Sequence, residues 1–382
     1  MEKVGAMKTS VVSKVTGSPN PPQTLTLNSE ILGEERKVYI QLPEGYEQTQ
    51  RAYPLLCVLD GEWLYEVVRA NLRFYSEYEV MGNRYPQMIV IGIENRDRDK
   101  DYVPTPDPQD PPMFPTAGKA DAFAQFLSAE LFPYLAQNYR LSPNRTVVGW
   151  SFGGLFALYA ALQHQDLFDS LLCIGPAIWW DDERVVKMFK EIPLRKKKRL
   201  VLTCGSEEKG GEVYDSVQSL LKLISEEPPA NLTSRYIEID GAGHGWAIPE
   251  AVDRGFKGLF EGYLPPQDVK SLKELDAYYA ALSNDWGYGV LPPESVMLKL
   301  ANDLWAADQK TEALEVVKQL LSASPHSSIG HFYLGKFLAL LDQTPSAIEA
   351  LQKAIQLEFE RPVPNLIYVR GYQNRLNKIL SD

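Results

Sequence analysis

One serine stands between two glycines at residues 149–153, in the order Gly-Trp-Ser-Phe-Gly. In many hydrolases a G-x-S-x-G turn presents a nucleophilic serine at a sharp bend between a strand and a helix. The apolar residues 146–148 before the turn have a strand pattern, and residues 154–162 after it have a helix pattern. We therefore predict that Ser151 is a nucleophile. The alternative is that it is a small residue in a tight turn.

A serine hydroxyl attacks efficiently only when a base takes its proton, and the chain has four histidines. His164 ends the helix that follows the serine, where we expect it to cap the helix or to face solvent. His326 and His331 lie in a helical repeat region near the C-terminus. His244 lies in the glycine-rich segment 241–245, after an apolar strand pattern, and in chain order the base of such hydrolases follows the last strand. We predict His244 as the base, against the alternative of an exposed loop histidine.

A carboxylate should follow the strand between these two residues, because it orients the imidazole and stabilises its charged form. Glu207 and Glu208 come directly after the apolar run that ends at Gly205. The spacing G-x-x-acid selects Glu208. Glu207, Asp240 at the end of the last strand, or no acid at all remain alternatives.

The negative charge that develops on an ester oxygen during attack needs two backbone N–H groups, an oxyanion hole. One donor should be the N–H of Phe152, which follows the nucleophile. The other should come from the turn 60–65, which makes Glu62 or Trp63 the donor. Asp60 is either a brace of that turn or an ordinary turn aspartate.

The elements that must position these residues alternate along the chain between strand and helix patterns. The expected strands lie within 37–46, 54–62, 86–95, 146–150, 170–176, 199–206 and 234–240, and the expected helices within 120–139, 153–163 and 211–227. Repeated βαβ units of this kind predict an α/β fold with a mainly parallel central sheet flanked by helices. Residues 96–118 are rich in proline and charge and are expected to form a long loop of functional importance.

Beyond residue 265 the strand patterns stop and an internal repeat begins. Apolar and small residues recur 34 positions apart, as in Leu300 with Leu334 and Ala313 with Ala347. This spacing resembles tetratricopeptide (TPR) repeats, although the two visible units are fewer than the three that a free-standing array needs. We expect these helices to pack on the catalytic domain or on a second copy of the chain.

We therefore divide the chain into four parts. They are a flexible leader over 1–22, an α/β-hydrolase catalytic domain over 23–265, a connector over 266–292 and a helical TPR-like domain over 293–382.

The composition of the 382-residue chain limits its partners and its location. Its net charge of −11 argues against nucleic acid as a partner. No apolar run is long enough to cross a membrane, and the N-terminus lacks the apolar stretch of a signal peptide. The three cysteines are expected to be buried and unpaired, and the basic run 195–199 to be a solvated connection rather than an anion site. We expect a cytoplasmic location, or a periplasmic one if a signal peptide has been removed.

Several segments carry a resemblance to a known family. They are 58–63, 95–105, 120–135, 145–162, 167–182 and 241–251, in this order. Residues 23–263 resemble the esterase-D-like branch of the α/β-hydrolases, in particular the enterobactin-esterase-like serine hydrolases that cleave siderophore esters.

The resemblance implies that Ser151 is the nucleophile, that His244 is the base and that Phe152 with the turn at 60–63 forms the oxyanion hole. Some of these hydrolases work with a Ser–His pair alone. The resemblance also implies that Trp179 and Trp180 lie near the mouth of the cleft. Two consecutive tryptophans cannot both be buried in the same way, so we expect one of them to present its face to substrate, against the alternative that both are packing residues.

In these relatives the loop matching 95–105 carries arginines that bind anionic, catechol-bearing substrates. Arg98 matches one of them. Lys100 stands where a second arginine is usual, and lysine lacks the planar fork of donors that arginine has.

Together these features predict a carboxylic ester hydrolase that forms an acyl-serine intermediate and needs no metal or cofactor. Its substrate would be a small-molecule ester, siderophore-like or otherwise bulky. The alternatives are an acyltransferase on the same fold, or a protein whose TPR-like tail binds a protein partner or forms a homodimer.

Overall fold

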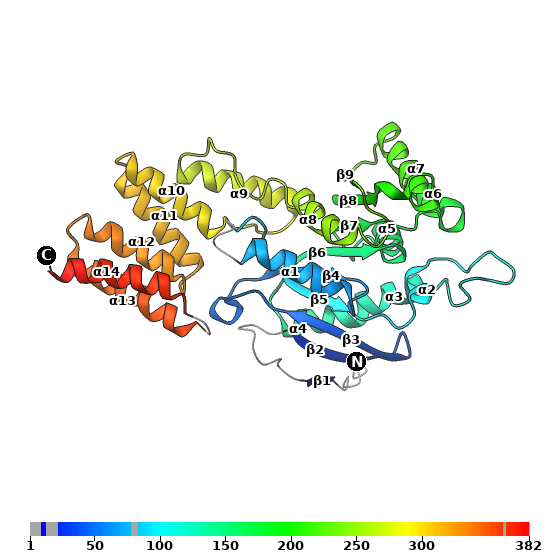
Figure 1. The fold of residues 1–382 in the computed structure, drawn as a ribbon, viewed down its shortest axis with the longest axis horizontal. Helices are drawn as coiled ribbons and strands as arrows, with labels where there is room; N and C mark the ends of the chain where they lie inside the picture. The colour runs from blue at the N-terminus through cyan, green and yellow to red at the C-terminus, as the bar shows by residue number, and fades with distance from the viewer. Residues whose placement is uncertain (1–8, 13–21, 78–82, 362–363, 382) are drawn as a thin grey trace.

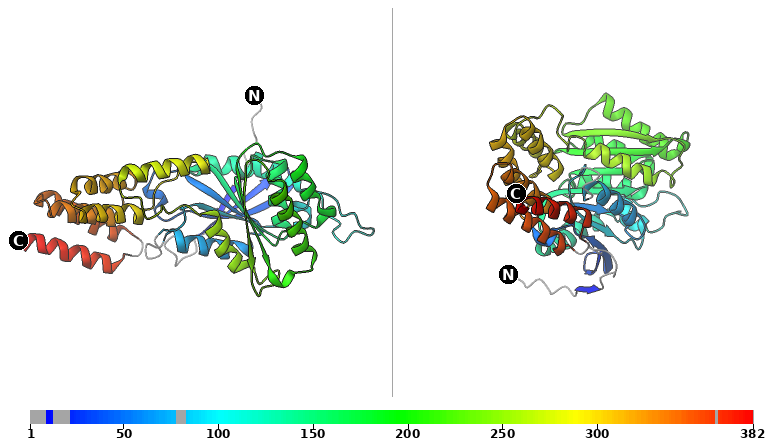
Figure 2. Two further views of the ribbon diagram at one scale, coloured as in Figure 1. Left: turned by 90° about the horizontal axis from the view of Figure 1, so that it is seen from above. Right: turned by 60° about the vertical axis from the view of Figure 1, so that its left-hand side comes forward.

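The computed structural model describes residues 9–12, 22–77, 83–361 and 364–381. An α/β body holds the first two thirds of the chain, and the last helices extend from one end of it (Figure 1). The loop between α2 (Arg98–Tyr102) and α3 (Ala120–Phe126) projects from the opposite end, as both Figure 1 and Figure 2 show. In the described part of the chain, no helix combines the length and the apolar character that a membrane crossing demands.

A single nine-stranded sheet runs through the body in the order β1-β2-β3-β5-β4-β6-β7-β8-β9. Its strands are β1 (Thr9–Val12), β2 (Gln23–Ser29), β3 (Glu34–Gln41), β4 (Tyr53–Val58), β5 (Ile89–Ile93), β6 (Leu141–Trp150), β7 (Ser170–Ile174), β8 (Lys198–Gly205) and β9 (Leu232–Ile239). The pairs from β5 to β9 are parallel, and β1, β2, β3 and β5 pair antiparallel. The mainly parallel sheet that the sequence predicted is confirmed.

Helices cover both faces of the sheet, which explains why its central strands are apolar on both sides. In β4, Leu55 and Cys57 face one core, and Leu56 and Val58 face the other. Helices α3 to α7 contribute to the first core, and α1 and α8 to the second. These helices are α1 (Leu64–Ser76), α3 (Ala120–Phe126), α4 (Phe132–Asn138), α5 (Phe152–Gln163), α6 (Trp180–Glu191), α7 (Glu212–Glu226) and α8 (Ile248–Leu259).

The sequence patterns missed several elements. Strand β2 alternates apolar and polar residues. It lies at the start of the catalytic domain, where we had predicted no strand. Helices α1, α6 and α8 were not predicted, although α1 and α8 are amphipathic. The expected helix over 120–139 is interrupted by a π-helical segment, Leu127–Leu131. The predicted long loop over 96–118 begins with a short helix, α2 (Arg98–Tyr102).

The leader predicted over residues 1–22 lies mostly outside the described residues. Within it, Thr9–Val12 form β1, which pairs antiparallel with β2.

The described residues of the C-terminal third form helices joined by loops, with no strand among them. It contains α9 (Leu272–Trp286), α10 (Glu294–Ala306), α11 (Lys310–Ala323), α12 (Ser328–Ala339), α13 (Thr344–Glu360) and α14 (Leu366–Ser381). Helices α12 and α13 each begin 34 residues after their counterparts α10 and α11. The helices therefore follow the spacing of the predicted repeat.

The first of these helices docks on the body through Trp286, which is buried at the end of α9. Its ring stacks on that of Tyr263, 6.1 Å away between centres, and the Arg199 guanidinium lies 4.2 Å from its centre. The side-chain amide of Asn144, at the start of β6, donates to the Trp286 carbonyl. One apolar core runs from α1 and α8 through α9 to α12.

This docking corrects part of our interpretation of the basic run 195–199 as a solvated connection, namely the part that concerns its last two residues. Lys198 is fully buried, and its ammonium donates to the carbonyls of Gln165 and Phe168. Arg199 packs on Trp286. Residues 195–197 are exposed, as expected, whereas Lys198 serves the interior of the protein and Arg199 its junction with α9.

We expect Trp286→Ala to lower the free energy of unfolding by about 3–5 kcal/mol, because it empties a large buried site in a shared core. Urea denaturation followed by circular dichroism measures this. The control Trp246→Ala removes a ring that is 88% exposed and should change stability by less than about 0.5 kcal/mol. Equal effects of the two changes would contradict a shared core.

Candidate active site

Ser151 occupies a strained turn between β6 and α5. Its φ of 55° lies in the left-handed region, which is uncommon for a residue with a side chain. The Ser151 N–H donates to the carbonyl of Ile174 on the neighbouring strand β7, at 3.0 Å. A Cβ at Gly149 would lie 2.3 Å from the carbonyl oxygen of Gly153, so the turn can close only with glycine there. Strained backbone of this kind is concentrated at functional sites.

His244 lies between β9 and α8, beside this turn. Its ring centre is 4.7 Å from that of Trp150, the residue before Ser151. The Trp150 indole N–H also donates to the His244 carbonyl, at 3.1 Å. The structure shows that Trp150 fixes both the ring and the backbone of His244.

Glu208 follows β8 in a short 3-10 turn and contacts the histidine directly. Its Oε2 lies 2.7 Å from His244 Nδ1, and its Oε1 accepts from the Gly205 N–H at 3.0 Å. Of the three acids considered, the other two lie elsewhere. Asp240 contacts the hydroxyl of Ser206, and Glu207 is exposed.

The surroundings of Glu208 favour its charged form. Partial burial alone would raise its pKa, but the hydrogen bonds from His244 and from the Gly205 N–H outweigh burial and lower the pKa below its usual value. An ionised carboxylate can only accept, so the neutral imidazole carries its proton on Nδ1. Nε2 is then left with a lone pair for taking a proton.

Gly175, in the loop after β7, packs directly against His244 and Glu208. Its φ is +46°, and a Cβ there would lie 3.0 Å from His244 Nδ1. We expect Gly175→Ala to displace the imidazole and to lower kcat by about 10²-fold, since catalytic geometry tolerates little displacement. Ester hydrolysis measures this, and a thermal melt separates the effect from unfolding. Gly210→Ala is a matched control because it shares a positive φ but has nothing within 4 Å of the added carbon.

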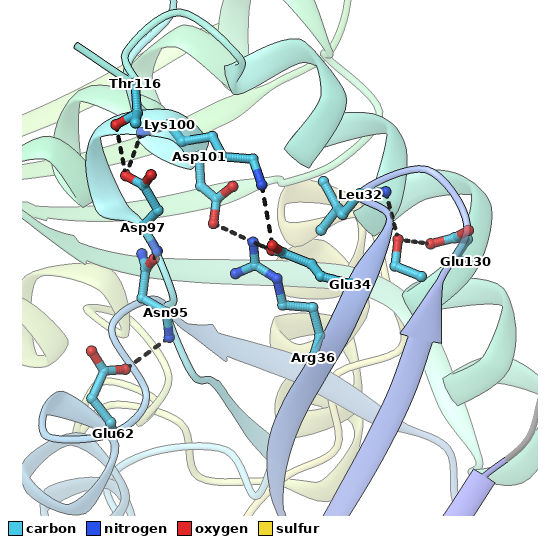
Figure 3. Close-up of polar contacts among 11 residues, drawn as sticks. Leu32, Glu34, Arg36, Glu62, Asn95, Asp97, Lys100, Asp101, Thr116 and Glu130 are labelled. Atoms are coloured by element: carbon cyan, nitrogen blue, oxygen red, sulfur yellow. Dashed lines mark hydrogen bonds and ion pairs between the residues drawn. The ribbon is translucent and has the colours of Figure 1, made fainter. Parts of the chain in front are cut away.

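The turn after β4 brings the second pair of predicted residues to the same edge of the sheet. The Trp63 N–H donates within the turn to the Asp60 carbonyl, at 3.3 Å. The Glu62 carboxylate accepts from the Asn95 N–H at 2.9 Å, which fixes the turn to the loop after β5 (Figure 3). Because the Trp63 N–H is used within the turn, Glu62 is the better placed of the two candidate oxyanion donors.

Asp60 and Arg98 form an ion pair that the sequence did not indicate. Asp60 is fully buried, and Arg98 contacts both of its carboxylate oxygens. Burial raises the pKa of Asp60 to about 6, against the opposing charge of Arg98. Asp60 therefore braces the turn, one of the two roles that the sequence left open.

Lys100 points to a different cluster. Its ammonium lies 3.2 Å from Glu34, which also pairs with the fully buried Arg36 (Figure 3). Asp101 completes this cluster, because it pairs with the same Nη2 of Arg36 as Glu34 does. The side chain that matches a substrate-binding arginine of the relatives thus contacts an acidic residue of this chain.

An aromatic group surrounds the Phe152 ring. Trp180 is buried, and its indole N–H donates to the Thr105 hydroxyl, whereas Trp179 is half-buried. Their ring centres lie 5.6 Å and 6.1 Å from that of Phe152. Phe114, from the long loop, packs against Phe152 at 5.3 Å. We had not singled out Phe114, although it is one of few apolar residues in that loop.

Two of the remaining three histidines have local partners. His164 Nε2 lies 2.7 Å from the Asp121 carboxylate, and His331 Nε2 lies 3.0 Å from the Pro325 carbonyl. The three cysteines are buried and free. Among the described residues, no three His, Cys, Asp or Glu side chains gather as metal ligands would.

Comparison with known proteins decides the family. The model of the family described as putative esterase matches residues 29–247, more than half of the chain. The chain belongs to the putative esterase family. This confirms the resemblance seen in the sequence, and the protein is a carboxylic ester hydrolase.

Two curated relatives of this esterase are themselves esterases by name. It is 25% identical over 225 residues to the ferri-bacillibactin esterase BesA of Bacillus subtilis, covering 54% of this chain and 78% of the relative. It is 34% identical over 88 residues to the siderophore enterobactin esterase of Emericella nidulans, covering 22% of this chain and 29% of the relative.

Two solved structures are similar to this esterase in fold. An IroE-like serine hydrolase from Shewanella oneidensis superposes with a TM-score of 0.69 at 25% identity, covering 77% of this chain and 98% of the other. An uncharacterised protein from Capnocytophaga ochracea, 19% identical with a TM-score of 0.61, covers 94% of this chain and 99% of the other. The similarity to the Capnocytophaga ochracea protein concerns the fold alone, but the superposed region includes residues of the C-terminal helices.

Proposed function

We propose that this esterase cleaves its ester through an acyl-serine intermediate, with Ser151, His244 and Glu208 as a catalytic triad. The observation that carries the proposal is the 2.7 Å contact between Glu208 Oε2 and His244 Nδ1, next to the strained Ser151 turn. This contact orients His244 as a base. The histidine lies beside a serine whose positive φ is uncommon for a residue with a side chain.

In this mechanism His244 Nε2 takes the Ser151 proton as the hydroxyl oxygen attacks the ester carbonyl. The imidazolium, stabilised by Glu208, then gives that proton to the leaving alcohol, and the acyl group stays on Ser151. Water, activated by the same imidazole, attacks the acyl-enzyme and releases the acid. The Phe152 and Glu62 N–H groups are the proposed oxyanion donors, and the N-terminus of α5 adds a favourable dipole.

We further propose a bulky, siderophore-like ester as substrate. The names of the two curated relatives support this class. The rings of Trp179 and Phe114, which flank Phe152, are suited to a large apolar or aromatic group. Trp179, being half-buried, is the tryptophan of the pair that we propose for substrate contact.

The experiment is a panel of esters, from short p-nitrophenyl esters to cyclic tri-lactones, with product analysis in the presence of acceptor alcohols. We expect release of free acid and a preference for the tri-lactones. A preference for short acyl chains would remove the siderophore class. Acyl transfer that outruns hydrolysis would make the protein an acyltransferase.

We also propose that the C-terminal helices join two copies of the chain. Large apolar side chains are exposed on α13 and α14, namely Phe359, Leu366, Ile367 and Leu380. Sedimentation should show a dimer, and Ile367→Glu should give a monomer. A monomeric wild type would leave a different protein as the partner.

For the location we propose the cytoplasm, since the three cysteines are free and buried, as in a reducing compartment. Fractionation of cells that express the full-length chain tests this. Recovery from the periplasm would show that a signal peptide had been removed.

A further inference from the structure

Arg98 lies at the start of α2 and makes an unusually complete set of contacts. Its Nε lies 2.7 Å from Asp60 Oδ1, and its Nη2 lies 3.1 Å from Asp60 Oδ2. The same Nη2 also lies 3.2 Å from the carbonyl oxygen of Trp150, and the guanidinium carbon lies 5.1 Å from the Trp150 ring centre. One edge and one face of the guanidinium are therefore occupied by the protein itself.

The two residues that Arg98 joins end neighbouring parallel strands. Asp60 follows β4, and Trp150 is the last residue of β6. Each stands two positions before a proposed oxyanion donor, because Glu62 follows Asp60 and Phe152 follows Trp150. A single side chain thus links both halves of the oxyanion hole.

The Asp60 end of this link is buried and closely packed. The carboxylate is fully buried, whereas the Arg98 side chain retains 28% exposure. The Asp60 N–H donates to the Tyr102 hydroxyl at 3.0 Å, and a Cβ on Gly153 would lie 3.5 Å from Asp60 Oδ2. The start of α5 therefore packs closely against this carboxylate. Without Arg98, Asp60 would be a buried carboxylate that has lost its ion-pair partner, a costly state that the turn can relieve by moving or by taking up a proton.

We propose that Arg98 is a positioning residue that holds the two halves of the oxyanion hole at their working separation, and not a ligand for anionic substrates. The inference rests on the proposed acyl-serine mechanism. Oxyanion donors act only on the charge that develops during attack, so a displaced donor lowers kcat more than it changes substrate binding.

The two roles of Arg98 predict different kinetics. A positioning residue affects neutral and anionic esters alike, through kcat. A ligand for a substrate carboxylate or catecholate affects anionic esters only, and mainly through KM.

The test compares p-nitrophenyl butyrate, which is neutral, with p-nitrophenyl hemisuccinate, which carries one carboxylate on an acyl chain of the same length. For Arg98→Gln we expect kcat to fall about 10²-fold on both esters, with the ratio of their KM values unchanged. Arg98→Lys keeps the charge but loses the fork of donors, so it should restore only part of kcat. The control Arg96→Gln removes an exposed arginine of the same loop and should leave both esters unaffected.

A rise in KM confined to the hemisuccinate, with kcat retained on the butyrate, would overturn the proposal. If Arg98→Gln fails to fold in a thermal melt, Arg98→Lys decides by the same comparison. Failure of the acyl-serine mechanism would give a different result, because turnover by the wild type would then not depend on Ser151. An active, Ser151-dependent wild type with an unimpaired Arg98→Lys variant contradicts only the positioning role.

Discussion

Ser151→Ala should lower kcat for ester hydrolysis by about 10⁵- to 10⁶-fold and leave the stability of the fold nearly unchanged. Loss of the nucleophile in a serine triad has effects of this size, because the remaining groups cannot form the acyl intermediate. The φ of 55° is unfavourable for serine and for alanine alike, so the substitution should add little backbone strain. Initial rates on p-nitrophenyl butyrate measure it.

A fluorophosphonate probe supplies a second readout that does not depend on choosing the right substrate. The wild type should be labelled at one residue, and Ser151→Ala should not be labelled. Ser219→Ala is the control, since that hydroxyl lies on α7 and donates to Glu183. Equal labelling of the wild type and Ser151→Ala would end the serine-hydrolase mechanism for this site.

The central fold and the site residues predicted from the sequence rest on local signals. A strand, a glycine-flanked serine and an apolar helix are contiguous at 146–162, so the elbow needs no knowledge of distant contacts. Gly205 and Glu208 lie in one short segment after a strand, and His244 follows the last strand. Parallel strands bring such loops to one edge of the sheet, so chain order alone indicated that they meet.

Other features depend on contacts between distant segments and were therefore missed. Asp60 and Arg98 are 38 residues apart, and neither residue type nor spacing shows that they pair. Lys198 belongs to a run of basic residues that normally faces solvent, yet carbonyls of the loop before β7 bury it. Helices α1 and α8 carry apolar residues at helical spacing, and weighing that periodicity more strictly would have found them.

Glu208→Gln should lower kcat by about 10⁴-fold, the second largest effect that we expect at this site. The glutamine amide can donate to His244 Nδ1, which would favour the imidazole tautomer with its proton on Nε2 and block proton removal from Ser151. Glu207→Gln and Asp240→Asn remove the same charge nearby without a contact to the imidazole, so each should change kcat by less than about fivefold. If Asp240→Asn is the damaging change, the acid is Asp240. If all three variants stay active, the enzyme works with Ser151 and His244 alone, and the 2.7 Å contact serves the structure of the loop and not its chemistry.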